Sequence, residues 1–249
     1  MAADHHTGTR DCYEEAARSL AAGKLSCCAP CAPQYFGAAA YPPAQLAGLP
    51  QAVIDSAMGC GHPVAAADLS AGDVVVDLGC GTGIDVLLAA RRIGPSGRAI
   101  GIDMTPGLIE LARGYARQAD IGNVSFHCAR IERLPLPDRS ADTVIANGTL
   151  SLSPDKETAF TQAARILRPG GRIILTDFIL RDGLDAGQRE DAGRQAGCLT
   201  GALAAAEYLR HLVETGFTQP EVRLDHRIAP GMYLGLVTAE RAPQPRPLP

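Results

Sequence analysis

The segment VVVDLGCGTG, residues 74–83, constrains the fold more than any other part of this chain. An apolar run leads into an aspartate and then into glycines at positions 79, 81 and 83. A continuous apolar run that ends in glycine is typical of a parallel strand buried on both faces. Glycines let the backbone turn tightly and approach a ligand closely. The segment therefore predicts a buried strand, a ligand-binding loop and the first turn of a helix.

The chemistry of this loop points to a nucleoside-containing ligand. The dinucleotide fingerprint G-x-G-x-x-G needs a glycine at position 84, where this chain has Ile84, so the pattern argues against nicotinamide and flavin cofactors. Asp103 ends the next expected strand, GRAIGID. A carboxylate at that position can accept hydrogen bonds from both hydroxyls of a ribose.

Strand and helix signals alternate from residue 70 onward. Apolar runs predict strands at 72–79, 97–103, 123–129, 142–147 and 172–180, and the segments 221–228 and 231–240 predict a terminal antiparallel pair. Helices are expected at 11–22, after the glycine loop, after Thr105 and Pro106, from Ser153 and Pro154, and at 204–217. This alternation predicts an α/β fold, a doubly wound, mostly parallel sheet with an antiparallel final strand.

Composition and charge narrow the possible partners. A net charge of −4 gives no electrostatic reason to expect nucleic acid or an anionic membrane surface. No stretch approaches the ~20 apolar residues of a membrane span, so we expect a cytoplasmic protein. We expect a Cys-containing N-terminal extension or lid at 1–68, a ligand-binding domain at 69–240 and a flexible proline-rich tail at 241–249.

Cysteine is the residue type that stands out chemically. The chain has eight cysteines, and such a surplus in a reducing compartment indicates soft-metal or thiol chemistry, or has no functional meaning. By contrast, His62, His127, His211 and His226 are scattered among unrelated elements. None of them forms a recognisable general base, and each is interpreted as a surface or packing residue.

Through DLGCGTG, Asp103 and the RPGG segment before the fifth strand, the chain resembles the class I S-adenosylmethionine-dependent methyltransferases. The resemblance implies that Asp77 and the loop hold the methionine end of the cofactor, through Gly79, Cys80, Gly81 and Gly83. It also implies that Asp103 holds the ribose and that Met104 lies against the adenine. Ile131 and Glu132 match the position that borders the adenine ring, and Asn147 is expected near the sulfonium.

Longer segments are similar to the arsenite methyltransferase family. They are the GCG-P motif before the first strand, the turn in LSLSPDK, and AGCLTGAL. That family generally binds trivalent arsenic through three cysteines. The resemblance assigns the first to Cys60 and the last to Cys198, and makes both the catalytic, arsenic-binding residues. The middle position is Gly148 in this chain.

The glycine at 148 leaves three interpretations open. Two thiolates suffice if the substrate already carries one carbon–arsenic bond, as methylarsenite or a larger organoarsenical does. A third thiol could instead come from Cys128 or from the cluster Cys27, Cys28 and Cys31. The chain could also be a small-molecule O-, N- or C-methyltransferase that has lost arsenic binding, or a metalloid- or cofactor-binding protein without turnover. The first interpretation implies small thiols or a thiol reductant as partners.

Overall fold

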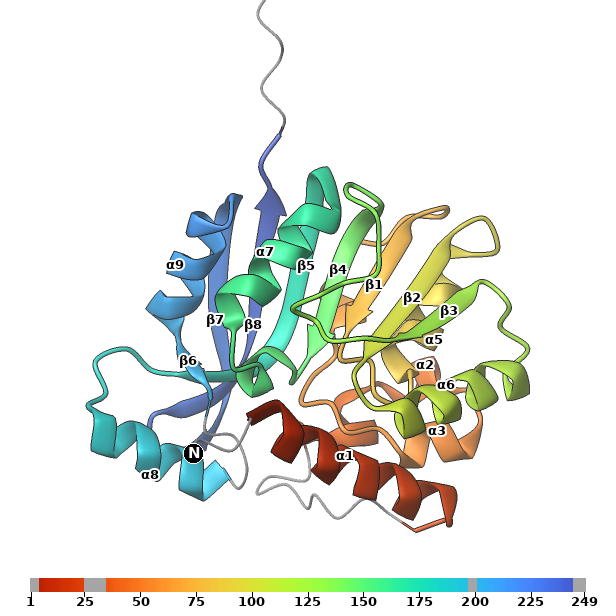
Figure 1. Ribbon diagram of the computed structural model, residues 1–249, viewed down its shortest axis with the longest axis horizontal. Coiled ribbons are helices and arrows are strands. Elements are labelled where there is room, and N and C mark those ends of the chain that lie inside the picture. Colours follow the sequence, from red (N-terminus) through yellow and green to blue (C-terminus); the bar gives the residue numbers. More distant parts are fainter. Residues whose placement is uncertain (1–4, 25–34, 197–200, 244–249) are drawn as a thin grey trace, which may run out of the picture.

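The computed structural model describes residues 5–24, 35–196 and 201–243. Their centre is a sheet in the order β3-β2-β1-β4-β5-β8-β7, with the short β6 paired to β5 outside this path. Strands β1 to β5 are parallel, whereas β8 runs antiparallel to both of its neighbours, β5 and β7. Figure 1 shows helices on both faces of this sheet. The predicted doubly wound fold with an antiparallel final strand is therefore confirmed.

The strands occupy the segments that the apolar runs indicate. They are β1 (Val74–Leu78), β2 (Arg98–Asp103), β3 (Val124–Cys128), β4 (Ala141–Asn147), β5 (Leu167–Leu180), β6 (Leu203–Ala204), β7 (Phe217–Ala229) and β8 (Met232–Arg241). The helices among them are α5 (Ile84–Ile93), α6 (Pro106–Gln118), the short 3-10 helix η3 (Leu150–Leu152), α7 (Lys156–Ile166), α8 (Ala186–Ala196) and α9 (Ala205–Glu214). Before β1 lie α1 (His5–Ala21), η2 (Gly37–Ala40), α2 (Pro43–Leu46), α3 (Gln51–Asp55) and α4 (Pro63–Ala66).

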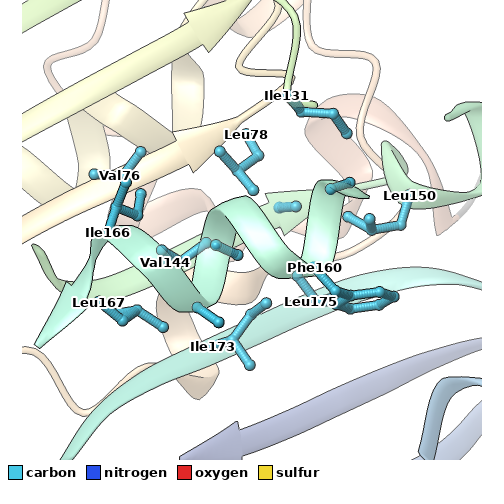
Figure 2. Packing of buried hydrophobic residues seen from close by; sticks show 14 of the residues in the cluster. Val76, Leu78, Ile131, Val144, Leu150, Phe160, Ile166, Leu167, Ile173 and Leu175 are labelled. Carbon is cyan, nitrogen blue, oxygen red and sulfur yellow. The ribbon is translucent and has the colours of Figure 1, made fainter. Parts of the chain in front are cut away.

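Side chains that alternate along the central strands feed two separate cores. Val76 and Val144 pack with Phe160 of α7 on one face, where α9 also contributes. Figure 2 shows α7 lying along the strands with its apolar side turned to them. Their neighbours Val75 and Ile145 point to the opposite face, which α5, α6 and the segments before β1 cover. A one-residue shift in register would reverse both faces, so the pattern fixes the pairing of the strands.

The differences from the sequence prediction include two helix starts and one helix that was not predicted. Helix α1 begins at His5 rather than at residue 11. Helix α7 begins after Asp155, whose side chain accepts a hydrogen bond from Thr158 N, so Asp155 and not Ser153 is the N-cap. Helix α8 was not predicted, because its sequence is polar and carries little periodic apolar pattern.

The carboxyl ends of β1, β2 and β4 meet at one edge of the sheet. Helix α1 crosses this edge in Figure 1 and packs on α6. The contact is close, since a Cβ on Gly107 would lie 2.9 Å from Cβ of Ala17. Within the described part of the chain, no helix is both long enough and apolar enough to cross a membrane.

Candidate cofactor pocket and adjoining thiol

The glycine loop connects β1 to α5 at this edge. Gly79, Gly81 and Gly83 all have positive φ, between 53° and 88°. A side chain at Gly79 would collide with Thr149, because a Cβ there would lie 2.3 Å from the Thr149 hydroxyl oxygen. The loop backbone therefore takes a path that glycine alone permits without strain. Gly83 is the N-cap of α5 and does not line the pocket described next.

A cavity of about 920 Å³ opens directly beyond the loop. Its walls come from the glycine loop, the ends of β2 and β4, the segment 129–132, the segment 57–59 and helix α1. Nine predicted cofactor residues line it: Asp77, Gly79, Cys80, Gly81, Asp103, Met104, Ile131, Glu132 and Asn147. The cavity lies where open α/β sheets bind ligands.

Two buried carboxylates face this cavity side by side. Asp77 ends β1, and Asp85 lies in the first turn of α5. Within the described residues, one oxygen of each, Oδ1, is buried and accepts no hydrogen bond. Burial and the neighbouring charge of Asp85 raise the pKa of Asp77 well above its usual value, and burial raises the pKa of Asp85 to about 6. A cationic group such as an ammonium would supply the missing hydrogen-bond donors and would favour the ionised form of both carboxyls.

Asp85 is a site residue that the sequence argument missed. A helix N-terminus favours a nearby carboxylate, and an aspartate two residues beyond the third glycine could have been noticed for that reason. Tyr41 was missed as well. Its hydroxyl donates to Asp85 Oδ2 at 2.9 Å across a separation of 44 residues, and no local pattern announces such a contact.

Asp103 is positioned as the sequence predicts. Its carboxylate accepts hydrogen bonds from the backbone N–H of Gly81 and of Thr105, each at 2.9 Å. These bonds hold the carboxylate against the loop and leave further lone pairs for hydroxyl groups. Burial raises the pKa of Asp103, and the two backbone N–H bonds oppose that shift.

Apolar side chains also line the cavity. They include Met104 and Ile131, and Glu132, which follows Ile131 in the chain, accepts a hydrogen bond from Ser153 Oγ at 2.5 Å. Thr9 and Tyr13 of α1 also line the cavity. Helix α1 therefore contributes directly to the pocket, and the sequence prediction for this region was an extension or lid without named contacts.

Cys60 lies just behind the wall that Gly148 forms. Its thiol is buried, and its Sγ donates to Thr176 O at 3.7 Å. A Cβ added to Gly148 would lie 3.5 Å from this sulfur. Apart from the adjacent residues of the chain, no other described atom would lie within 4 Å of it. Burial, and next the charge of Asp177, raises the pKa of the Cys60 thiol well above its usual value. Cys60 also lines a second cavity, together with Tyr35, Thr176 and His226.

Cys128 is not brought to this thiol. It ends β3 beside Asp103, so three strand spacings, about 14 Å, separate it from Asn147 at the end of β4. This separation argues against Cys128 as a third ligand beside Cys60, and the residue is exposed. Cys198 and the cluster Cys27, Cys28 and Cys31 lie outside the described residues.

A family model described as "Methyltransferase domain" matches residues 69–216. The chain belongs to this methyltransferase family. The resemblance found in the sequence is thereby confirmed, and with it the enzyme class and its cofactor, S-adenosylmethionine. The described residues fit that cofactor. The unsatisfied oxygens of Asp77 and Asp85 suit its ammonium, Asp103 suits its ribose, and Met104 with Ile131 suits its adenine.

Relatives of this methyltransferase include arsenite methyltransferases. One from Halobacterium salinarum is 38% identical over 168 residues, which are 68% of this chain and 43% of the relative. A crystal structure of an arsenic(III) S-adenosylmethionine methyltransferase from Chlamydomonas reinhardtii is 31% identical, with a TM-score of 0.71 over 83% of this chain and 74% of that one. A 27-O-demethylrifamycin SV methyltransferase from Amycolatopsis mediterranei is also 38% identical, over 61% of this chain and 56% of the relative. The methyltransferase spans about half the length of the curated relatives it matches.

Proposed function

We propose that this methyltransferase methylates a trivalent arsenical that the thiolates of Cys60 and Cys198 hold. The position of Gly148 carries the proposal. It lines the cofactor pocket, and a Cβ there would lie 3.5 Å from the Cys60 sulfur. An atom bound to Cys60 in front of Gly148 would therefore face the pocket. Gly201, three residues after Cys198, supports the second ligand, because it packs against the backbone of Ser151 in η3, shortly after Gly148.

The chemistry of the acceptor explains why the site needs no general base. Bound S-adenosylmethionine supplies a methyl group on a positively charged sulfur that leaves as a neutral thioether. Trivalent arsenic bound to thiolates keeps a lone pair, which forms the new arsenic–carbon bond without loss of a proton. The protein has to align the two reactants and keep water out. The buried thiol behind the pocket wall and the cover that α1 provides serve those two tasks.

The glycine at position 148, where the related enzymes have a cysteine, supports a substrate that already carries one carbon–arsenic bond. Methylarsenite, or a larger organoarsenical, has one valence occupied by carbon and offers two sites to sulfur. Two thiolates then complete its coordination, and the open space at Gly148 receives the organic substituent. Inorganic arsenite would lack its third sulfur ligand in this site and would react more slowly.

The proposed reaction needs small thiols as partners, to deliver the arsenic and to reduce the product. Because burial keeps Cys60 protonated near neutral pH, arsenic is best delivered by exchange from an arsenic–thiol adduct, whose leaving thiolate takes up the proton. Methyl transfer also takes two electrons from the arsenic. A pair of thiols that becomes a disulfide can return them and release a trivalent product. A cytoplasmic location, which would provide such thiols, stays a prediction.

A panel of arsenicals tests the substrate. Purified enzyme is incubated with S-adenosylmethionine, a thiol reductant and either arsenite, methylarsenite or phenylarsenite, and the products are identified by mass spectrometry. We expect methylated products from the organoarsenicals at rates at least tenfold above the rate with arsenite. Faster methylation of arsenite than of any organoarsenical would refute the substrate class.

A second candidate function is methylation of an oxygen, nitrogen or carbon atom on a small organic molecule. The relative that acts on demethylrifamycin SV favours it, because its identity equals that of the Halobacterium salinarum arsenite methyltransferase. Substituting Cys60 and Cys198 by serine separates the two. An arsenical methyltransferase loses turnover, whereas an enzyme with an organic acceptor keeps it. A protein that binds cofactor or arsenic without turnover releases no S-adenosylhomocysteine with any substrate.

We also propose the division of the chain into a lid at 1–68, a catalytic domain at 69–240 and a tail at 241–249. The part of the lid that is described supports it, since α1 lines the cofactor pocket and the segment 57–62 carries Cys60. Loss of cofactor binding after removal of residues 1–24, with the remaining chain still folded, would support a lid.

A further inference from the structure

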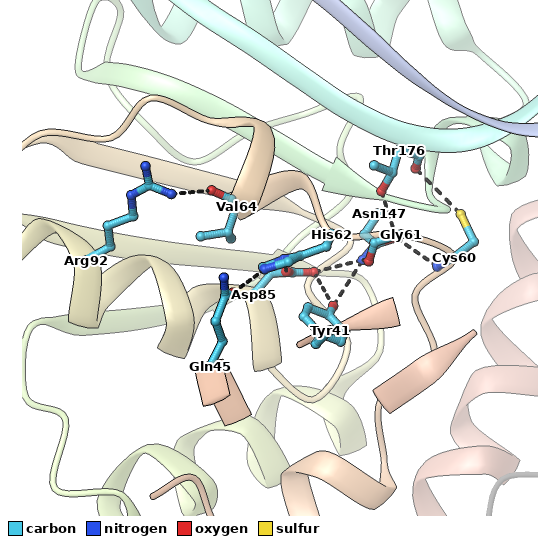
Figure 3. Close-up of polar contacts among 10 residues, drawn as sticks. All are labelled: Tyr41, Gln45, Cys60, Gly61, His62, Val64, Asp85, Arg92, Asn147 and Thr176. Atoms are coloured by element: carbon cyan, nitrogen blue, oxygen red, sulfur yellow. Dashed lines mark hydrogen bonds and ion pairs between the residues drawn. The ribbon is translucent and has the colours of Figure 1, made fainter. Parts of the chain in front are cut away.

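Asn147 ends β4 between the cofactor pocket and the Cys60 thiol, and its side chain is fully used. Its Oδ1 accepts hydrogen bonds from Cys60 N at 2.8 Å and from Thr176 Oγ1 at 2.9 Å. Its Nδ2 donates to Gly61 O at 2.8 Å and to Asp85 Oδ2 at 2.9 Å, with Tyr41 Oη at 3.1 Å. Figure 3 shows the amide at the centre of these contacts. An amide group suits this position because it carries both an acceptor oxygen and a donor nitrogen.

On one side, Asn147 holds the backbone on both sides of the reactive cysteine. Cys60 N and Gly61 O bond to the two ends of the same amide. The segment also lies against Asn147 and Thr176 without any spare room. A Cβ on Gly59 would lie 2.2 Å from Asn147 Nδ2, and one on Gly61 would lie 2.7 Å from Thr176 Cβ. The two glycines of the GCG motif therefore allow the cysteine backbone to sit directly on this amide.

On the other side, Asn147 reaches the carboxylate that faces the cofactor. Asp85 Oδ2 accepts from Asn147 Nδ2 and from the Tyr41 hydroxyl. Its second oxygen, Oδ1, is buried, lies 3.9 Å from His62 Nδ1 and accepts no hydrogen bond among the described residues. One end of this carboxylate thus belongs to the Asn147 junction, and the other end accepts no hydrogen bond within the described residues, while Asp85 itself lines the cofactor pocket.

We propose that Asn147 is a positioning residue that couples cofactor binding at Asp85 to arsenical binding at Cys60. The proposal rests on the proposed function, because it takes Cys60 as an arsenic ligand. A cofactor ammonium on Asp85 Oδ1 keeps the carboxylate ionised and fixed, and an ionised acceptor strengthens the bond from Asn147. The amide then holds the Cys60 backbone more tightly, so binding of the arsenical costs less conformational entropy. Each ligand therefore favours the other by the same factor.

This coupling suits an alignment-limited reaction. In-line transfer needs the reacting atoms about 3–3.5 Å apart, and an error of about 1 Å can cost a hundredfold in rate. The pocket is formed mainly at the strand ends, and Cys60 stands on the crossing segment 57–62, whose residues 57–59 also line the pocket. Asn147 lines the pocket and bonds to Cys60 N, so it helps to fix the distance between the two ligands.

Binding measurements without turnover test the coupling. Titration calorimetry measures the affinity of methylarsenite with and without saturating S-adenosylhomocysteine, which keeps the ammonium of the cofactor but has no methyl group to transfer. We expect methylarsenite to bind at least fivefold tighter in its presence, at the lower end of measured couplings between sites. In Asn147→Ala the ratio should fall to about one. Equal affinities in the parent enzyme, or an unchanged ratio in Asn147→Ala, would overturn the proposal.

Three further variants complete the test. Thr176→Val removes the hydroxyl that bonds to Asn147 Oδ1 but leaves the contacts to Cys60 and Asp85, so it should keep the ratio. Asp85→Asn keeps an oxygen that can accept from Asn147 and Tyr41 but removes the negative charge. The affinity ratio should therefore fall to about one in this variant, which provides the test even if Asn147→Ala does not fold. Retention of the ratio in Asp85→Asn contradicts the coupling. Cys60→Ser tests the proposed function separately, because methylarsenite binding that survives it refutes the arsenic site itself, whatever the coupling.

Discussion

At the scale of single residues, the proposed substrate class depends on Gly148. It has a φ of +74°, a conformation that a residue with a side chain adopts at a cost of about 1–3 kcal/mol. A cysteine at this position would adopt the strained conformation and would place a second sulfur beside that of Cys60. The sequence could identify the departure from the family pattern, but only the distance of 3.5 Å between a Cβ at 148 and the Cys60 sulfur shows that the two positions adjoin.

The first prediction restores the missing thiol. Gly148→Cys should raise the rate with arsenite relative to methylarsenite by at least tenfold, because a third thiolate completes the coordination of inorganic arsenic. Gly148→Ser is the matched control, since it imposes the same backbone strain and similar bulk without a thiol. The arsenical panel measures the rate ratio, and an equal change in both variants would contradict the explanation.

The second prediction concerns pH. Burial raises the pKa of Asp85 to about 6, and the proposed pairing with the cofactor ammonium requires the ionised form. At pH 5 about a tenth of the carboxyl is ionised, so S-adenosylhomocysteine should bind about tenfold more weakly than at pH 7.5. Calorimetry at the two pH values measures this, and Asp85→Asn should flatten the dependence. An affinity that stays constant over this range in the parent enzyme would argue against pairing with Asp85.

The same carboxyl affects the free protein in the opposite direction. Because its folded pKa lies above its ordinary value of 3.8, its contribution to folding stability is fully present below that ordinary pKa. The contribution is lost as the pH rises through about 6. Bound cofactor compensates for this loss, since it supplies the missing positive partner. The stability of the free enzyme and its affinity for cofactor therefore change in opposite senses across this interval.

At the scale of elements, the crossing segment 57–62 is the part of the site that local sequence rules do not reveal. In the sequence, the GCG motif carries part of the resemblance to arsenite methyltransferases. In the structure, the same residues pack against Asn147 and Thr176. Gly59 faces the amide of Asn147 and Gly61 faces Thr176, both from strands more than 80 residues further along the chain. Strand periodicity predicts where β4 ends, but it cannot predict which distant loop packs on that end.

The third prediction tests this packing. Gly59→Ala should destabilise the fold by about 1–3 kcal/mol, because the added methyl group overlaps the Asn147 amide. It should also weaken arsenical binding, since it displaces Cys60. Gly122→Ala is the control: it adds the same group where no atom lies within 4 Å. Denaturant unfolding and calorimetry measure both effects, and equal stabilities of the two variants would contradict the contact.

The elements themselves were largely predictable. Each of the five long apolar runs from residue 72 to residue 180 became a strand, since burial on both faces leaves a continuous apolar pattern in the sequence. The short helices α2, α3 and α4 were not predictable, because four or five residues carry no helical periodicity. Asp103 and the glycine loop could be placed from sequence since parallel strands end at one edge, whereas Tyr41 depends on a contact between distant segments.

At the scale of the whole molecule, the cofactor pocket joins parts of the chain from α1 to η3. A ligand held by so many separate segments stabilises the folded state and none of the unfolded ones. The fourth prediction follows. At a hundred times its dissociation constant, S-adenosylhomocysteine should add about 2.7 kcal/mol to the free energy of unfolding, which raises Tm by about 5–10 °C in a chain of this size.

Removal of the ribose carboxylate provides the comparison. Asp103→Ala should bind S-adenosylhomocysteine more weakly and therefore show a smaller shift in Tm at the same ligand concentration. Differential scanning calorimetry measures both proteins. A full shift in Asp103→Ala would mean that the cofactor binds elsewhere, even though the pocket meets the chemical requirements of the ligand.

The two cavities that adjoin Cys60 have a consequence for the order of binding. The cofactor pocket approaches the thiol through Gly148, and the second cavity approaches it beside Tyr35 and His226, with the exposed Asp225 at its rim. An arsenical that enters through the second cavity would leave the path of the cofactor open. Initial rates should therefore obey a random sequential scheme, in which S-adenosylhomocysteine competes with the methyl donor and not with the arsenical. A single shared entrance would instead force one reactant to arrive first.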